Sequence, residues 1–146
     1  MTRVKAAAVI YYIDADMLGL ASVLGRLRDD VTYPGDPGAV IHKRERPACP
    51  VKSPDVEDVD WIPLVASNGW VILTRDRRIQ DHRREIQMVR EHGARMVALS
   101  GRDARSTFDQ LEIVLCQWRA IERLRPQAGP YVYTATRTSL HPVPLG

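Results

Sequence analysis

The sequence predicts an α/β fold: a single domain in which a small, mostly parallel sheet lies between layers of helices. Apolar segments typical of buried strands alternate along the chain with segments whose apolar residues recur at helical spacing. Two of the apolar segments, Val9–Ile13 and Trp70–Leu73, lead into polar residues that include an aspartate. A length of 146 residues and a hydrophobic content of 45% fit one domain with one core.

The first half of the chain is expected to contain a central strand, one helix and two short strands. The continuous apolar run over Val4–Ile13 predicts a strand that is buried on both faces. Apolar residues at helical spacing predict a helix over Ala15–Asp29. Short strands are expected over Val31–Tyr33 and Ala39–His42, with a turn of proline and glycine between them. The three prolines of His42–Pro54 predict a loop without a regular element.

The second half is expected to continue the alternation of helix and strand. A helix is predicted over Asp60–Asn68, with its first residue as the N-cap, and a second strong strand over Trp70–Thr74. The helix Arg83–His92 and the strand Arg95–Leu99 follow. The last helix, Thr107–Leu124, has a single apolar stripe that includes Leu115. This alternation predicts a parallel sheet with helices on both faces.

The predicted domain covers residues 1–125, and residues 126–146 are expected to form a C-terminal tail. From Gln127 onward the chain contains three of the ten prolines, several threonines and tyrosines, and no helical period. Such a segment is either flexible or laid along a partner.

Cysteine usage and hydropathy favour a cytoplasmic protein without a membrane segment. Cys49 and Cys116 have no metal-binding or redox spacing. Cys116 falls on the apolar face of the last predicted helix, so a buried thiol is expected, while Cys49 in the proline-rich loop is expected to be incidental. A secreted chain of this size would more often carry disulfides. The N-terminal apolar run is too short to span a membrane and lacks a small-residue cleavage site.

Aspartates gather where the two main strands are expected to end. Asp14 and Asp16 follow the first strand, Asp76 follows the second, and Asp58 and Asp60 lie just ahead of the apolar part of the helix between them. Taken singly, each could be a helix cap or a turn residue. If the strands are parallel neighbours, however, their carboxyl ends share one edge of the sheet. Carboxylates gathered there would repel one another without a cation, so a hard divalent metal is the leading interpretation.

A run of arginines directly follows the second strand. Seven arginines and two histidines lie between residues 75 and 95, interleaved with acids, in a chain of net charge +3. Pairing with those acids would make the run an ordinary solvated helix face. Its position beside Asp76 favours instead a surface that contacts phosphates, formed by the first five arginines: Arg75, Arg77, Arg78, Arg83 and Arg84.

Three segments carry a recognisable pattern: Tyr12–Gly19, Asp58–Pro63 and Gly69–Asp76, the last with an apolar strand that ends in Thr-Arg-Asp. Together they resemble PIN-like domains of the VapC toxin type, in a shortened subgroup, over roughly Val9 to Leu124. The resemblance implies a small α/β endoribonuclease that hydrolyses RNA with Mg²⁺ or Mn²⁺. It also implies the toxin component of a toxin–antitoxin system, with an antitoxin protein as partner, and PIN toxins are often homodimers.

The resemblance assigns roles to the aspartates. Asp14 would be the first metal ligand, Asp60 (or Asp58) the middle one and Asp76 the last, with Asp16 as an adjacent helper. Longer PIN domains add a glutamate on an extra helical hairpin between the first and middle acids. In this chain that region is proline-rich, and its acids lie on no predicted helix: Asp36, Glu45, Asp55 and Glu57.

Two other classes of function stay open from the sequence. A catalytically silent PIN-like module would bind RNA or a protein partner without cutting, and the missing glutamate and the mixed charge of the arginine run favour it. A flavodoxin-like or receiver-type domain would also gather acids at strand ends, but a receiver needs a lysine at a later strand end. Lys5, Lys43 and Lys52 do not lie there.

Overall fold

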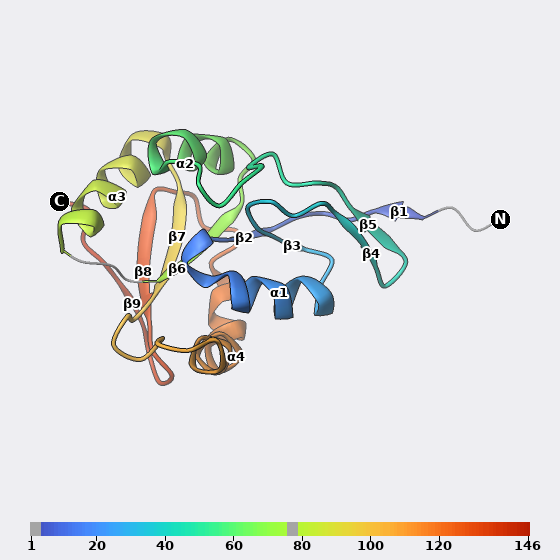
Figure 1. Cartoon of the computed structure of the whole chain (residues 1–146). Coiled ribbons are helices and arrows are strands. Elements are labelled where there is room, and N and C mark those ends of the chain that lie inside the picture. Colours follow the sequence, from blue (N-terminus) through green and yellow to red (C-terminus); the bar gives the residue numbers. More distant parts are fainter. Residues whose placement is uncertain (1–3, 76–78) are drawn as a thin grey trace.

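The computed structural model describes residues 4–75 and 79–146, without the side chains of residues 79–82. In this part of the chain, two sheets and four α-helices form a mixed α/β domain (Figure 1). The elements, in chain order, are β1 (Lys5–Ala6), β2 (Tyr11–Ile13), the 3-10 turn η1 (Ala15–Met17), α1 (Leu18–Leu27), β3 (Val31–Thr32), β4 (Ala39–Ile41), β5 (Arg44–Arg46), α2 (Asp58–Ser67), β6 (Val71–Arg75), α3 (Ile79–His92), β7 (Arg95–Leu99), α4 (Thr107–Arg123), β8 (Tyr131–Ala135) and β9 (Leu140–Pro142).

The main sheet has the strand order β3-β2-β6-β7-β8-β9, as far as the described residues go. Neighbouring strands from β3 to β8 are parallel, and only β9 runs antiparallel to its neighbour. The chain moves outward from β2 to β3 and then crosses back to β6 on the other side of β2. The order of the strands therefore reverses between β2 and β6, and ligands of open α/β sheets bind at the carboxyl ends of such strands.

Side chains of the central strands alternate between two cores. Tyr11 and Ile13 of β2 pack into one core with α1 and α4, whereas Tyr12 packs into the other with α2 and α3. Because successive strand residues point to opposite faces, a fully apolar strand serves both cores. Figure 1 shows the resulting three layers, with α1 and α4 on one face of the sheet and α2 and α3 on the other. The expected α/β, three-layer architecture is confirmed.

The small three-stranded sheet, in the order β1-β5-β4, departs from the expectation in two ways. The apolar run Val4–Ile13 is not one strand, because β1 pairs with β5 in a separate three-stranded sheet and only β2 enters the main sheet. The predicted loop His42–Pro54 contains β5, which forms a hairpin with β4. His42 and Lys43 both have positive φ, as a two-residue turn with right-handed strand twist requires. The prolines begin just after β5, so they do not interrupt it.

The C-terminal segment belongs to the main sheet. β8 pairs with β7 over five residues, and β9 pairs with β8. The segment expected as an extended tail, flexible or laid along a partner, thus supplies two strands of the domain's own sheet. Tyr131 and Ala135 are buried in one core and Val132 in the other, so β8, like β2, contributes to both.

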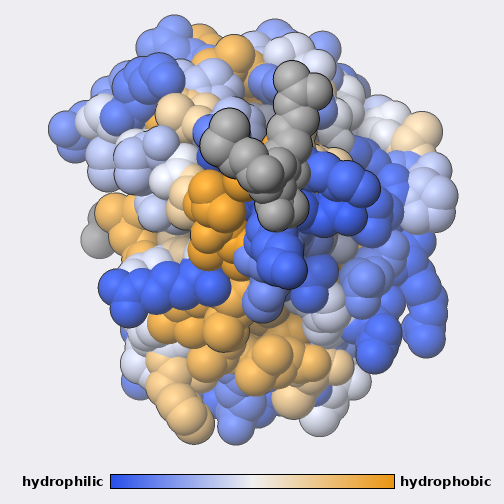
Figure 2. All heavy atoms as spheres, turned by 90° about the vertical axis from the view of Figure 1, so that its right-hand side faces the viewer, coloured by the Kyte–Doolittle hydropathy of each residue, from blue (hydrophilic) through white to orange (hydrophobic). Residues whose placement is uncertain are grey.

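One side of the molecule has an exposed apolar area, in the lower half of Figure 2. Leu27 of α1 and Leu115 of α4 are 59% and 63% exposed and line a shallow hollow between their helices. Leu115 and Cys116 were expected on the buried stripe of α4, but both are exposed. Val114 and Ile121, also expected there, are buried, and so is Ile113. The thiol that is buried belongs to Cys49, in the core beneath α2. Among the described residues, no helix is long and apolar enough to cross a membrane.

A buried ion pair holds the segment that leads to α2. The side chains of Asp36 and Arg46 are 0% and 2% exposed and are joined at 2.7 Å. Asp36 also accepts hydrogen bonds from the Thr32 hydroxyl and the Gly38 amide, each at 2.9 Å. The Arg46 guanidinium donates to the Gly25 carbonyl at 2.9 Å and to the Arg28 carbonyl at 3.1 Å. The pair thus ties the segment after β3 to the end of α1, and its charges are matched by hydrogen bonds.

Arg46→Met is expected to destabilise the protein by about 3–5 kcal/mol, because the Asp36 carboxylate would stay buried without its cation. Urea unfolding measures this difference. The matched control is Arg44→Met, since Arg44 is 53% exposed and pairs with Asp29 at 3.7 Å. That change should cost less than about 1 kcal/mol. Equal effects of the two substitutions would contradict a stabilising role for the buried pair.

Candidate active site

Asp14 occupies the carboxyl end of β2 at the point where the strand order reverses. Its amide donates to the Leu73 carbonyl at 2.9 Å, which extends the pairing of β2 with β6 by one residue. Its carboxylate accepts the Ala15 amide at 2.6 Å and the Thr74 hydroxyl at 2.8 Å. The residue is only 1% exposed. These donors fix the orientation of a buried carboxylate at the edge where open α/β sheets bind ligands.

Asp16 lies one residue into the 3-10 turn and is exposed. Its carboxylate accepts the Arg75 amide at 3.3 Å and lies 3.5 Å from the Thr74 hydroxyl. Thr74 has one hydroxyl proton, so the shorter contact with Asp14 takes precedence. Asp16 thus contacts the end of β6 next to Asp14, as expected of a residue adjacent to the first proposed metal ligand.

The acids at the start of α2 are separated by the helix geometry. The helix begins at Asp58, with Glu57 as its N-cap, so the expected N-cap role of Asp60 is wrong. Asp58 is half-buried and accepts a hydrogen bond from the Trp61 indole nitrogen at 2.8 Å. Asp60 is exposed and does not line the pocket described next, because two residues of helix turn it about 200° away from Asp58.

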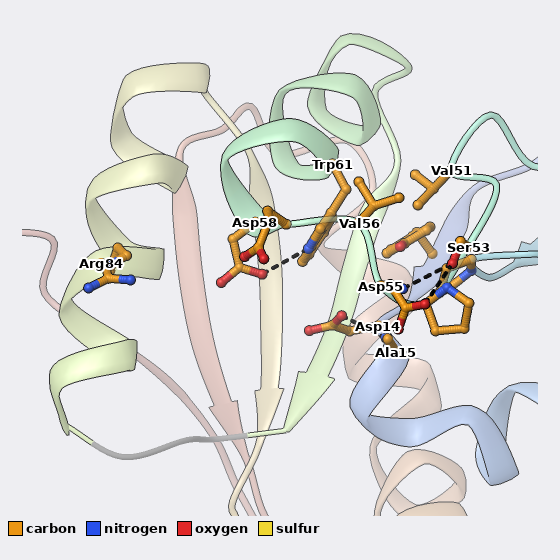
Figure 3. Close-up of a pocket in the computed structure, with 13 residues that line it drawn as sticks. Asp14, Ala15, Val51, Ser53, Asp55, Val56, Asp58, Trp61 and Arg84 are labelled. Atoms are coloured by element: carbon orange, nitrogen blue, oxygen red, sulfur yellow. Dashed lines mark hydrogen bonds between the residues drawn. The ribbon is translucent and has the colours of Figure 1, made fainter.

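Asp14 and Asp58 line the same pocket, which has a volume of about 340 Å³. Figure 3 shows their carboxylates turned toward one space, with Arg84 of α3 across it. Asp55 and Glu57, from the segment just ahead of α2, also line the pocket. Its charged groups, as far as they are described, are therefore four carboxylates and one guanidinium. Such a surface is strongly negative and attracts cations.

Tyr12 forms the inner wall of this pocket, and its ionisation reflects the same charges. Burial raises the pKa of the Tyr12 phenol well above its ordinary value of 10.0, and negative charges at Asp14 and Asp58 raise it further. Tyr12 therefore stays neutral at physiological pH.

The arginine run divides into residues with different surroundings. Arg75 donates to the Gly101 carbonyl at 3.2 Å, and its buried Nε has no hydrogen-bond partner among the described residues. Arg83 and Arg84 are exposed on α3, and only Arg84 lines the acidic pocket. Arg77 and Arg78, like Asp76, lie outside the described residues. The expectation for Asp76 thus stays a prediction from the sequence.

A comparison with protein-family models matches residues 11–101 to a family described as PIN like domain. The matched segment runs from β2 to just beyond β7 and makes up more than half of the chain. The chain belongs to the PIN-like domain family. Comparisons with curated proteins and with solved structures gave no match.

PIN-like domains are commonly nucleases and generally use divalent metals. Among the described residues, no group of three or more His, Cys, Asp or Glu side chains is arranged to hold a metal ion. Mg²⁺, however, is usually held by one or two carboxylates together with water and substrate oxygens. Asp14 and Asp58 supply two oxygen ligands of that kind on one pocket, so the donor chemistry of this PIN-like domain fits the metal of its family.

Asp55 and Glu57 are pocket residues that the sequence did not single out for the site. Both were seen only as acids of a proline-rich segment where longer PIN-like domains have a helical glutamate. Their closeness to Asp58 in the sequence could have indicated them, since both lie within three residues of it. The chain that leads into a helix beginning at the site must itself pass beside the site. No spacing rule identifies such loop residues in advance.

Proposed function

We propose that this PIN-like domain is an endoribonuclease that hydrolyses RNA phosphodiester bonds with Mg²⁺ or Mn²⁺. The observation that carries the proposal is the convergence of Asp14 and Asp58 on one pocket at the point where the strand order reverses. A divalent metal bound there would activate water and neutralise charge on the phosphate. The family supports nuclease activity in general, and the choice of RNA rests on the resemblance of the three motifs to VapC-type proteins.

The roles of individual residues follow from their positions. Asp14, buried and held by Thr74, would be the rigid ligand, and Asp58 the second one. Asp76 would complete the set as the third catalytic acid, because it directly follows Arg75 at the end of β6. Asp58 replaces Asp60 as the middle acid in this proposal, since only Asp58 lines the pocket. Asp16 would support Asp14 from the neighbouring turn.

The RNA backbone would approach from the side of α3. Arg84 lines the pocket opposite the acids and offers a cation to a phosphate. Arg75, Arg77, Arg78 and Arg83 are proposed from the sequence to extend the same surface. Without these arginines, a polyanion would be repelled by the carboxylates of the pocket.

We further propose that the protein is the cytoplasmic toxin of a toxin–antitoxin pair, with an antitoxin protein as partner and a homodimer as its own assembly. The support is the resemblance to VapC-type toxins. The alternative is a silent PIN-like module that binds RNA or a protein without cutting. Cleavage by purified protein distinguishes the two.

Asp14→Asn and Asp58→Asn are each expected to lower RNA cleavage by a factor on the order of 100 or more, because each removes a charge from the proposed metal site. Asp76→Asn should behave in the same way, whereas Asp60→Asn should cut at a rate close to that of the unaltered protein. Cleavage is measured on varied RNAs with Mg²⁺, Mn²⁺ or EDTA, and circular dichroism checks the fold. Full metal-dependent cleavage by both Asp14→Asn and Asp58→Asn would disprove the assignment. No cleavage by the unaltered protein with either metal would favour the silent module.

Arg84→Gln is expected to weaken RNA binding and to reduce its dependence on salt, because one phosphate contact is lost. In the logarithmic plot of affinity against salt, the slope should fall by about 0.7 for a single-stranded RNA. Fluorescence anisotropy on the Asp14→Asn background measures binding without cleavage. Arg119→Gln is the control, since Arg119 is 89% exposed on α4, away from the pocket. Identical slopes for Arg84→Gln and Arg119→Gln would exclude Arg84 from the RNA contact.

The toxin proposal predicts growth arrest in bacterial cells that express the unaltered protein, and normal growth in cells that express Asp14→Asn at the same level. The physical reason is that only a cutting enzyme depletes RNA. Growth curves and immunoblots measure both quantities. Arrest by both proteins would mean that toxicity does not come from cleavage.

A further inference from the structure

Trp61 lines the candidate active-site pocket together with Asp14 and Asp58. It is 3% exposed, its ring stacks on the ring of Tyr12 with centroids 5.1 Å apart, and its indole nitrogen donates to Asp58 Oδ1 at 2.8 Å. Tyr12 belongs to β2, two residues before Asp14, and Trp61 follows Asp58 by one turn of α2. The two rings therefore connect the strand end that carries Asp14 with the helix turn that carries Asp58. Figure 3 shows the hydrogen bond between Trp61 and Asp58.

The acceptor of the indole N–H distinguishes Trp61 from an ordinary core tryptophan. A buried indole N–H needs an acceptor, and a backbone carbonyl would be sufficient for that purpose. Here the acceptor is a carboxylate on the wall of a pocket. A hydrogen bond to an ionised acceptor is shorter and about twice as strong as a neutral one, so it restricts the rotation of the Asp58 side chain. The position of the Trp61 ring is itself restricted, because the ring is buried and stacks on Tyr12.

We propose that Trp61 is a positioning residue for metal binding, whose indole N–H orients the Asp58 carboxylate toward the space that Asp14 also faces. The role rests on the proposed function, because it exists only if Asp14 and Asp58 hold a divalent cation. Removal of a group that hydrogen-bonds to a metal ligand typically lowers metal affinity by a factor of about 10–100. Trp61 thus contributes to metal affinity without contacting the metal.

Trp61→Phe tests this role, because phenylalanine keeps an aromatic ring against Tyr12 and removes the N–H donor. The affinity of the RNA-free protein for Mn²⁺, measured from the electron paramagnetic resonance signal of unbound Mn²⁺, should fall about tenfold or more. On an Asp58→Asn background, the same substitution should cause no further loss, because the residue through which Trp61 acts has already changed.

Trp70→Phe is the matched control. Trp70 packs against the same core, but it lines a hollow with Gly69 and Gly93 at the opposite end of β6. Its loss should leave Mn²⁺ affinity unchanged. If Trp61→Phe and Trp70→Phe lower the affinity equally, or if Trp61→Phe binds Mn²⁺ as the unaltered protein does, the positioning role is overturned and the proposed function stands. If the unaltered protein binds no Mn²⁺, both are overturned.

A second measurement does not depend on the folding of a Trp61 variant. The three indole N–H signals of the unaltered, ¹⁵N-labelled protein can be followed by nuclear magnetic resonance and assigned through Trp70→Phe and Trp118→Phe. Substoichiometric Mn²⁺ should broaden the Trp61 signal first, because its N–H is bonded to a proposed ligand. Equal broadening of all three signals, or earlier loss of the Trp118 signal, would overturn the proposal.

Discussion

The pairing of β2 with β6 is the constraint on which the rest of the candidate site depends. β2 has only three residues, yet Tyr11, Tyr12 and Ile13 are all at most 1% exposed and pair in register with Val71, Ile72 and Leu73. This register brings Asp14 against Thr74, 60 residues away in sequence. A slip by one residue would turn each side chain of β2 to the opposite core and would move Asp14 away from its donor. The packing of both cores therefore fixes the position of a single carboxylate.

The electrostatics of the pocket complement this rigidity. Asp14 is buried with specific donors, whereas the acids ahead of α2 lie near a helix N-terminus, whose dipole favours negative charge. Among the described residues, Arg84 is the one cation on the pocket wall, beside four carboxylates. A divalent ion bound there would add positive charge to a wall on which the described carboxylates outnumber the described cations. The site thus combines one immobile acid with others whose orientation depends on neighbours such as Trp61.

The sequence predicted those parts of the fold that depend on local patterns. β7 was found to the residue, and α1 and α4 to within a few, because continuous β-branched runs and helical periods are local signals. β8 was missed because its partner β7 lies on the far side of α4 in the sequence, so no local pattern links the two strands. β5 and β9 were missed because each has only three residues, too few to give a recognisable period. In the site, the choice between Asp58 and Asp60 depended on where α2 begins, and helix ends are the least certain part of such a prediction. Asp55 and Glu57 reach the pocket only through the path of a loop.

The buried pair of Asp36 and Arg46 has a consequence for how this sequence can diverge. The two residues stand ten positions apart and anchor the segment between β3 and α2. A substitution at either position alone leaves an uncompensated charge in the interior, whereas a joint replacement by apolar residues of similar volume removes both charges at once. The effects of substitutions at the two positions on stability are therefore not independent. Lineages that keep this compact connection are expected to retain both residues or to exchange both together.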